Sequence, residues 1–189
     1  MATSVPAQTP APPHWSLEEY DRAIAAGVFG ERRIELIRGA LYEMPPMADP
    51  HAGVLRYLND LFVTTLGMGR VLCQTPIILP TDSEPEPDLA VAEANSPPRP
   101  RADQVQLVIE ITDEGRRRFD RGPKLEAYLV DEIPEIWIVD LVERAVLVYR
   151  GQVLVGRHTQ GRGAELRAER VPEVGVDVDA VFRAARLSS

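Results

Sequence analysis

The sequence has a single cysteine and no long hydrophobic run. One cysteine excludes an intrachain disulfide, and the apolar neighbours Val71 and Leu72 predict that Cys73 is buried as a small hydrophobic residue. No apolar run approaches the roughly 18 residues that a membrane-spanning helix needs, so we expect that this protein is not an integral membrane protein. Residues 1–14 are rich in Ala and Pro but lack the basic and apolar regions of a secretory signal. They predict a disordered leader on a cytoplasmic protein.

Positive charge is also scarce. The chain has 21 Lys plus Arg against 29 Asp plus Glu, and its net charge is −8. Because basic residues supply most of the non-specific affinity for nucleic acid, any DNA-binding surface has to be local. One local candidate is the run Arg116, Arg117, Arg118 and Arg121, which is equally consistent with a solvated loop. The chain has only one lysine, Lys124, and it lies beside this run.

The remaining composition is that of one globular domain, which we expect to span residues 15–189. Its mixture of predicted helices and strands makes the fold class α/β (α+β). Hydrophobic periodicity and turn residues predict the elements in order. These are a helix over 16–26, a hairpin over 33–44, a helix over 50–66, strands over 71–79, 89–92 and 105–112, a helix over 120–130, strands over 135–140 and 145–149, further edge strands over 152–156 and 165–174, and a terminal helix over 177–185.

Three residues of this pattern carry the chemistry of a hydrolase. Asp88 stands at the entry of one strand, Glu110 lies near the end of the next, and Lys124 is in the opening turn of the following helix. Strand alternation places Glu110 on the same face as the apolar Val108, so its carboxylate has to be paired, hydrated or bound to a metal. Two carboxylates and an ammonium at one sheet edge suit metal-dependent phosphodiester cleavage. The alternative is structural: Asp88 caps the strand entry and Glu110 forms an internal salt bridge with Lys124.

Other polar residues give weaker signals. Alternation places Glu35 on the face opposite Ile34 and Leu36, which favours an exposed carboxylate. His51 lies on the inner side of the first turn of its helix, where a structural histidine is commoner than a ligand. The carboxylates of the proline-broken loop, Asp82, Glu84 and Glu86, are expected to be solvated.

Together these residues resemble the Uma-two family of predicted restriction endonucleases, which belongs to the PD-(D/E)XK nuclease superfamily. The resemblance covers roughly residues 16 to 150. The segments that carry it are Glu35, His51, Pro87-Asp88, Val108 to Thr112, Asp120 to Leu125 with Tyr128, and Ile133 to Asp140. It implies a restriction-endonuclease-like αβββαβ core, with a mixed central sheet flanked by helices and extra C-terminal β-hairpin strands.

The resemblance also implies a site. Asp88, Glu110 and the backbone carbonyl of Ile111 would hold Mg²⁺, or Mn²⁺ in its place, while Glu35 would hold a second metal or an outer water. The superfamily lysine normally follows the acidic strand residue by two positions, where this chain has Thr112, and Lys124 matches the displaced position of the Uma-two pattern. His51 and the arginine run 116–118 with Arg121 would contact nucleic-acid phosphates.

These residues predict a magnesium-dependent endonuclease that hydrolyses phosphodiester bonds in DNA. The alternative is a catalytically inactive nuclease fold that serves as a nucleic-acid-binding or assembly module, which the overall acidity favours. A homodimer would suit cleavage of both strands and is common for nucleases of this fold, so we expect one.

Overall fold

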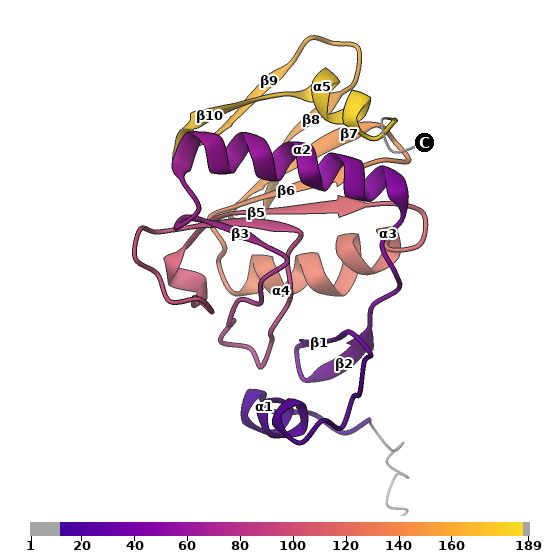
Figure 1. The fold of residues 1–189 in the computed structure, drawn as a ribbon, viewed down its shortest axis with the longest axis vertical. Helices are drawn as coiled ribbons and strands as arrows, with labels where there is room; N and C mark the ends of the chain where they lie inside the picture. The colour runs from indigo at the N-terminus through magenta and orange to yellow at the C-terminus, as the bar shows by residue number, and fades with distance from the viewer. Residues whose placement is uncertain (1–11, 187–189) are drawn as a thin grey trace, which may run out of the picture.

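The computed structural model describes residues 12–186. Its centre is a six-stranded sheet in the order β3-β4-β5-β6-β7-β8, in which β5 and β6 run parallel and all other neighbours run antiparallel (Figure 1). The strands are β3 (Val71–Cys73), β4 (Leu89–Ala92), β5 (Val105–Thr112), β6 (Glu135–Asp140), β7 (Ala145–Arg150) and β8 (Val153–Thr159). A short 3-10 turn, η1 (Ala102–Gln104), leads into β5.

Helices cover both faces of this sheet (Figure 1). The long helix α2 (Asp49–Leu66) lies on one face with the terminal helix α5 (Val178–Ala184) and the hairpin β9 (Glu165–Ala168)–β10 (Val171–Asp177). The opposite face carries α3 (Arg117–Phe119), the π-helical segment η2 (Asp120–Lys124) and α4 (Leu125–Val130). The order α2, β3, β4, β5, α4, β6 is the αβββαβ core that the sequence predicts.

Alternation along β5 separates two hydrophobic cores. Leu107 and Ile109 pack toward α2, in the cluster that contains Phe62 and Phe182. Val108 packs toward α4, in the cluster that contains Tyr128. Glu110 shares the second face with Val108, so its carboxylate points into the layer between the sheet and α4.

A smaller unit precedes the core. The helix α1 (Leu17–Ala25) begins at Ser16, whose side chain forms the expected capping box with Glu19. The hairpin β1 (Ile34–Ile37)–β2 (Ala40–Glu43) follows it. This hairpin is attached to the loop before β4, because the Glu84 amide donates to the carbonyl of Leu36 at 2.7 Å. Figure 1 shows α1, β1 and β2 at the end of the molecule opposite α5.

Two predicted elements are wrong in their boundaries. The strand expected over 71–79 ends at Cys73, because Gln74 adopts a left-handed backbone conformation with φ of 46°. Cys73 is therefore exposed rather than buried. The helix expected over 120–130 is broken at Gly122, whose φ of −117° and ψ of −111° are not helical. The break lies within η2, and the regular helix α4 begins at Leu125.

Two further expectations concern the N-terminal residues and membrane-spanning helices. Residues 1–11, most of the predicted leader, lie outside the described residues. None of the helices within residues 12–186 combines the length and the apolar character needed to cross a membrane.

Phe62 tests the packing of α2 on the sheet. Its side chain is 1% exposed, so Phe62→Ala removes a fully buried ring and leaves a cavity. We expect the free energy of unfolding to fall by about 3–5 kcal/mol, measured by chemical denaturation. Met68→Ala is the control, since Met68 is 80% exposed just beyond the same helix and its truncation should change stability by less than about 0.5 kcal/mol. Equal effects of the two substitutions would contradict this packing.

Candidate functional site

The buried ammonium of Lys124 joins elements that are far apart in the sequence. Its Nζ atom lies 3.0 Å from Oε1 of Glu110 and 3.2 Å from Oε2 of Glu35, and it donates to the carbonyl oxygen of Glu86 at 2.9 Å. The side chain is only 4% exposed. The structure thus brings Lys124 and Glu110 into contact, as the strand and helix positions require, and it adds Glu35 from β1.

Asp88 is held at the entry of β4 by donors from three other elements. Its Oδ1 atom accepts from Nε2 of His51 at 2.9 Å and from the Gln74 amide at 3.4 Å, while Oδ2 accepts from the Ile111 backbone N–H at 2.8 Å. Burial opposes ionisation of this carboxyl, but the His51 hydrogen bond and the charge of Lys124 lower the pKa of Asp88 below its ordinary value. Asp88 is therefore a carboxylate with a fixed orientation.

The pKa of Glu110 is shifted in the opposite direction to that of Asp88. Burial raises the pKa of Glu110 well above its ordinary value, although the charge of Lys124 lowers it. The Tyr128 hydroxyl donates to its Oε1 atom at 2.6 Å. Burial also raises the pKa of Glu35. For Lys124, burial opposes the charge, but Glu110 and Glu35 outweigh it and the pKa of the ammonium is raised. Lys124 is a fixed cation among several buried acids.

Asp120 is a member of this cluster that sequence reasoning missed. It is 3% exposed within η2, and its Oδ2 atom has no hydrogen-bond partner. Burial raises the pKa of Asp120 to about 7, against the lowering effect of Lys124. The irregular turn at Gly122 decides this placement, and no periodicity in the sequence indicates it.

Two predictions of exposure are wrong. Glu35 is 3% exposed rather than solvated, because its carboxylate is directed to the buried Lys124 ammonium. Glu84 is 5% exposed and forms an ion pair with Arg99, whereas Asp82 and Glu86 keep partial exposure. His51 is fully buried, and its ring is directed to Asp88.

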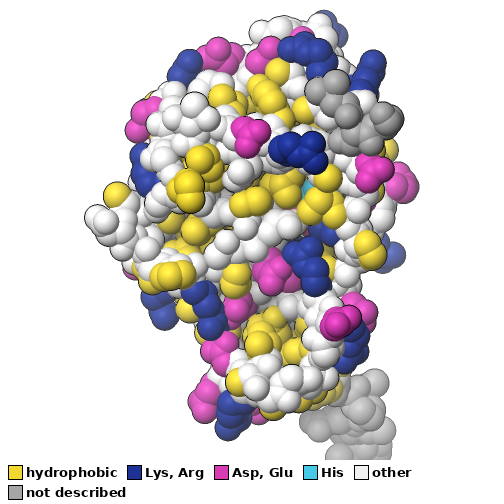
Figure 2. All heavy atoms as spheres, in the orientation of Figure 1, with side chains coloured by type: hydrophobic (Ala, Val, Ile, Leu, Met, Phe, Trp, Pro, Cys, Tyr) yellow, Lys and Arg dark blue, Asp and Glu magenta, His cyan; other side chains and the backbone are white. Residues whose placement is uncertain are grey.

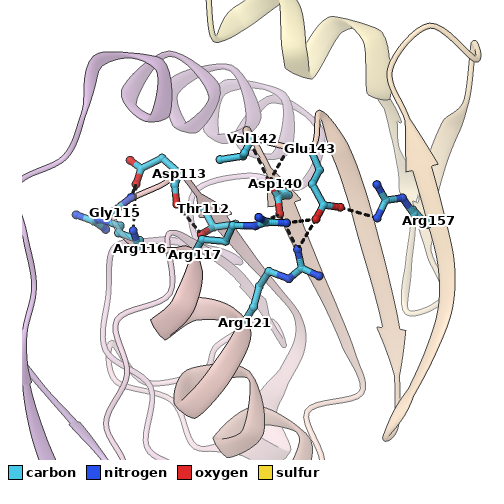
Figure 3. A network of polar contacts seen from close by, with 10 residues as sticks. All are labelled: Thr112, Asp113, Gly115, Arg116, Arg117, Arg121, Asp140, Val142, Glu143 and Arg157. Carbon is cyan, nitrogen blue, oxygen red and sulfur yellow. Dashed lines mark hydrogen bonds and ion pairs between the residues drawn. The ribbon is translucent and has the colours of Figure 1, made fainter.

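The arginine run is largely occupied by internal ion pairs (Figure 3). Arg117 and Arg121 both contact Oδ2 of Asp140, at 2.9 and 2.8 Å, and both also contact Glu143. The other two arginines of the run have different surroundings. Arg116 is buried and donates to the carbonyl of Pro45 at 2.7 Å, while Arg118 is exposed. Figure 2 shows basic and acidic side chains interspersed over the visible face rather than a continuous basic surface.

Comparisons with known proteins show the family and the fold of the chain. A protein-family model, Uma2, described as "Putative restriction endonuclease", matches residues 17–179. The chain belongs to the Uma2 family. The resemblance stated from the sequence is thereby confirmed. No protein with a curated description matches the chain.

A solved structure gives independent support for the fold. The crystal structure of "a putative nuclease belonging to DUF820" from Anabaena variabilis ATCC 29413 superposes with a TM-score of 0.69. The match covers 90% of this chain and 98% of that one at 16% sequence identity. At this identity the likeness shows that the Uma2 chain has the expected restriction-endonuclease-like fold.

The Uma2 residues fit a divalent cation only in part. Within the described residues 12–186, no three His, Cys, Asp or Glu side chains are grouped so that they could hold a metal ion. Asp88 and Glu110 supply two carboxylates. The Ile111 carbonyl lies on the same strand edge as the Ile111 N–H that donates to Asp88, since both groups of one strand residue point the same way. Two carboxylates and one carbonyl suffice for Mg²⁺, which retains several waters.

The buried Asp120 carboxyl makes stability depend on pH. Below pH 3.8 it is protonated in both states, whereas between pH 3.8 and about 7 the unfolded chain loses a proton that the folded protein keeps. The free energy of unfolding therefore falls as pH rises through this window. Asp120→Asn should be more stable than the parent protein above pH 7, by on the order of 4 kcal/mol, and nearly equal to it at pH 4.

Chemical denaturation at several pH values measures this difference. Asp103→Asn is the matched control, because Asp103 is exposed and its substitution should show no such pH dependence. A stability difference for Asp120→Asn that is the same at pH 4 and pH 8 would rule out the raised pKa.

Proposed function

We propose that this Uma2 protein is a metal-dependent endonuclease that hydrolyses phosphodiester bonds in DNA. The observation that carries the proposal is the contact of the Lys124 ammonium with Glu110 and Glu35, close to an ionised Asp88 on the neighbouring strand. Family membership supports the nuclease class, and the chemistry and the substrate are our inference from these residues.

Asp88, Glu110 and the Ile111 carbonyl would hold the cation. Mg²⁺ or Mn²⁺ bound there supplies charge neutralisation at the scissile phosphate and an acidified water. The protein's part is to orient the ligands and to keep Asp88 ionised. His51 and the Ile111 N–H fix the Asp88 carboxylate, and Tyr128 fixes Glu110.

Lys124 acts as a permanent charge in this proposal. Its raised pKa means that the ammonium keeps its proton at neutral pH, so it does not serve as a general base. An ammonium in this place stabilises the negative charge that develops on the phosphate in the transition state. Glu35, 3.2 Å from Nζ, orients the ammonium and limits its movement.

Substrate binding would depend on few basic residues. The ion pairs of Arg117 and Arg121 with Asp140 and Glu143 neutralise the centre of the run, which leaves the exposed Arg118 as its candidate phosphate contact. His51 is buried against Asp88, so it supports the carboxylate rather than the nucleic acid. A homodimer and a cytoplasmic location remain predictions from the sequence.

One observation favours the second candidate, an inactive nucleic-acid-binding or assembly module. The Lys124 ammonium already has three oxygen partners and is almost fully buried, so the site is satisfied as an internal salt bridge. A nicking assay separates the two functions.

We expect the purified protein to convert supercoiled plasmid to open circles with Mg²⁺ or Mn²⁺ and not with a chelator. Asp88→Asn, Glu110→Gln and Lys124→Met should each lower the nicking rate by on the order of 100-fold or more, because each removes a group that would hold the cation or stabilise the developing charge. Asp103→Asn should keep the parent rate, and circular dichroism should verify that each variant is folded. Parent activity in all three variants would show that these residues do not form the active site. A parent protein that binds DNA without cutting it would support the second candidate, the inactive nucleic-acid-binding module.

Arg118 tests the mode of DNA contact. Arg118→Ala should weaken DNA binding for all sequences alike and reduce the salt slope of the association constant by about one, since one phosphate contact is lost. Fluorescence anisotropy at several salt concentrations measures both quantities. Arg183→Ala, an exposed arginine on α5, is the control and should leave the slope unchanged. An unchanged slope in Arg118→Ala would exclude this contact.

A further inference from the structure

Gln74 lies at the end of β3, next to the point where Asp88 enters β4. Its backbone N–H donates to the Asp88 carbonyl at 3.1 Å and continues the β3–β4 pairing by one step. Its side-chain amide donates to Oδ1 of the same Asp88 at 3.4 Å. Both the backbone and the side chain of Gln74 are therefore directed to one residue of the candidate site.

The backbone of Gln74 is in a conformation that side chains other than glycine rarely adopt. Its φ is 46°. The other non-glycine residues with positive φ within 12–186 are Arg38, Asp82, Asn95, Glu132 and Arg144. Of this described set, Gln74 alone has a side-chain hydrogen bond to a carboxylate of the candidate site. A strained residue at such a place is commonly kept for a function of its side chain.

The two donors on Oδ1 of Asp88 differ in their surroundings. His51 is completely buried, whereas Gln74 is half-buried and so lies nearer to solvent. With the Ile111 N–H on Oδ2, these donors fix the plane of the carboxylate from both oxygens. Removal of Gln74 would leave Oδ1 with a single donor and the solvent side of the carboxylate without support.

We propose that Gln74 is a positioning residue that orients Asp88 for a divalent cation, and that its left-handed backbone is what aims the amide at this carboxylate. The inference rests on the proposed function, because it takes Asp88 as a metal ligand. Outer partners of metal ligands of this kind commonly contribute a tenfold or larger factor to metal affinity.

Two substitutions separate a positioning role from a structural one. Gln74→Gly removes the amide and relieves the backbone strain, so it should raise the midpoint of chemical denaturation. Gln74→Met removes the amide and keeps both the bulk and the strain. Mn²⁺ alone, titrated into the folded apo protein by calorimetry, should bind about tenfold more weakly to both variants. Asn95→Gly, which relieves a left-handed residue in an exposed loop, should bind Mn²⁺ like the parent protein.

The outcomes are distinct. Parent-like Mn²⁺ affinity in Gln74→Gly would overturn the proposal, even if Gln74→Met bound more weakly, since the amide would then not be what sets the metal affinity. A parent protein that binds no Mn²⁺ would overturn both this proposal and the proposed metal site. A parent protein that binds Mn²⁺ in a Gln74-dependent manner but leaves DNA intact would support the positioning role and refute only the endonuclease.

Discussion

The candidate site depends on the contacts that the buried Lys124 ammonium makes with carboxylates. It lies among the carboxylates of Glu35, Glu110 and Asp120, all of which are at most 3% exposed. Burial of carboxylates without a partner is strongly unfavourable, so a single cation holds β1, β5 and η2 in one place. The same contact joins the small N-terminal hairpin to the core through Glu35, in addition to the backbone hydrogen bond between Glu84 and Leu36.

Two arginines outside the site stabilise the segment that carries Lys124. Arg117 and Arg121 flank Asp120, and both are tied to Asp140 at the end of β6 (Figure 3). Asp140 also accepts from the amides of Val142 and Glu143, so it is bound on both oxygens. These ion pairs fix the irregular segment that carries Lys124. They also explain how a run of arginines in an acidic protein produces no broad basic surface.

Irregular backbone shapes the site at two points. Gly122 breaks the helix so that Asp120 and Lys124 both point inward, and Gln74 ends β3 so that its amide reaches Asp88. Regular helix or strand geometry at either point would direct these side chains elsewhere. The site is thus assembled where local conformational preference gives way to tertiary contacts.

The sequence by itself determined the αβββαβ order, the face on which Glu110 lies and the family, because periodicity and ordered motifs are local properties. It also determined that one lysine stands among many arginines. Only the tertiary structure decided that Glu35 and Asp120 are buried beside that lysine, that His51 and Gln74 hold Asp88, and that Arg117 and Arg121 are paired internally. These outcomes depend on contacts between residues that are distant in the chain and on two backbone irregularities, and neither leaves a periodic signal in the sequence.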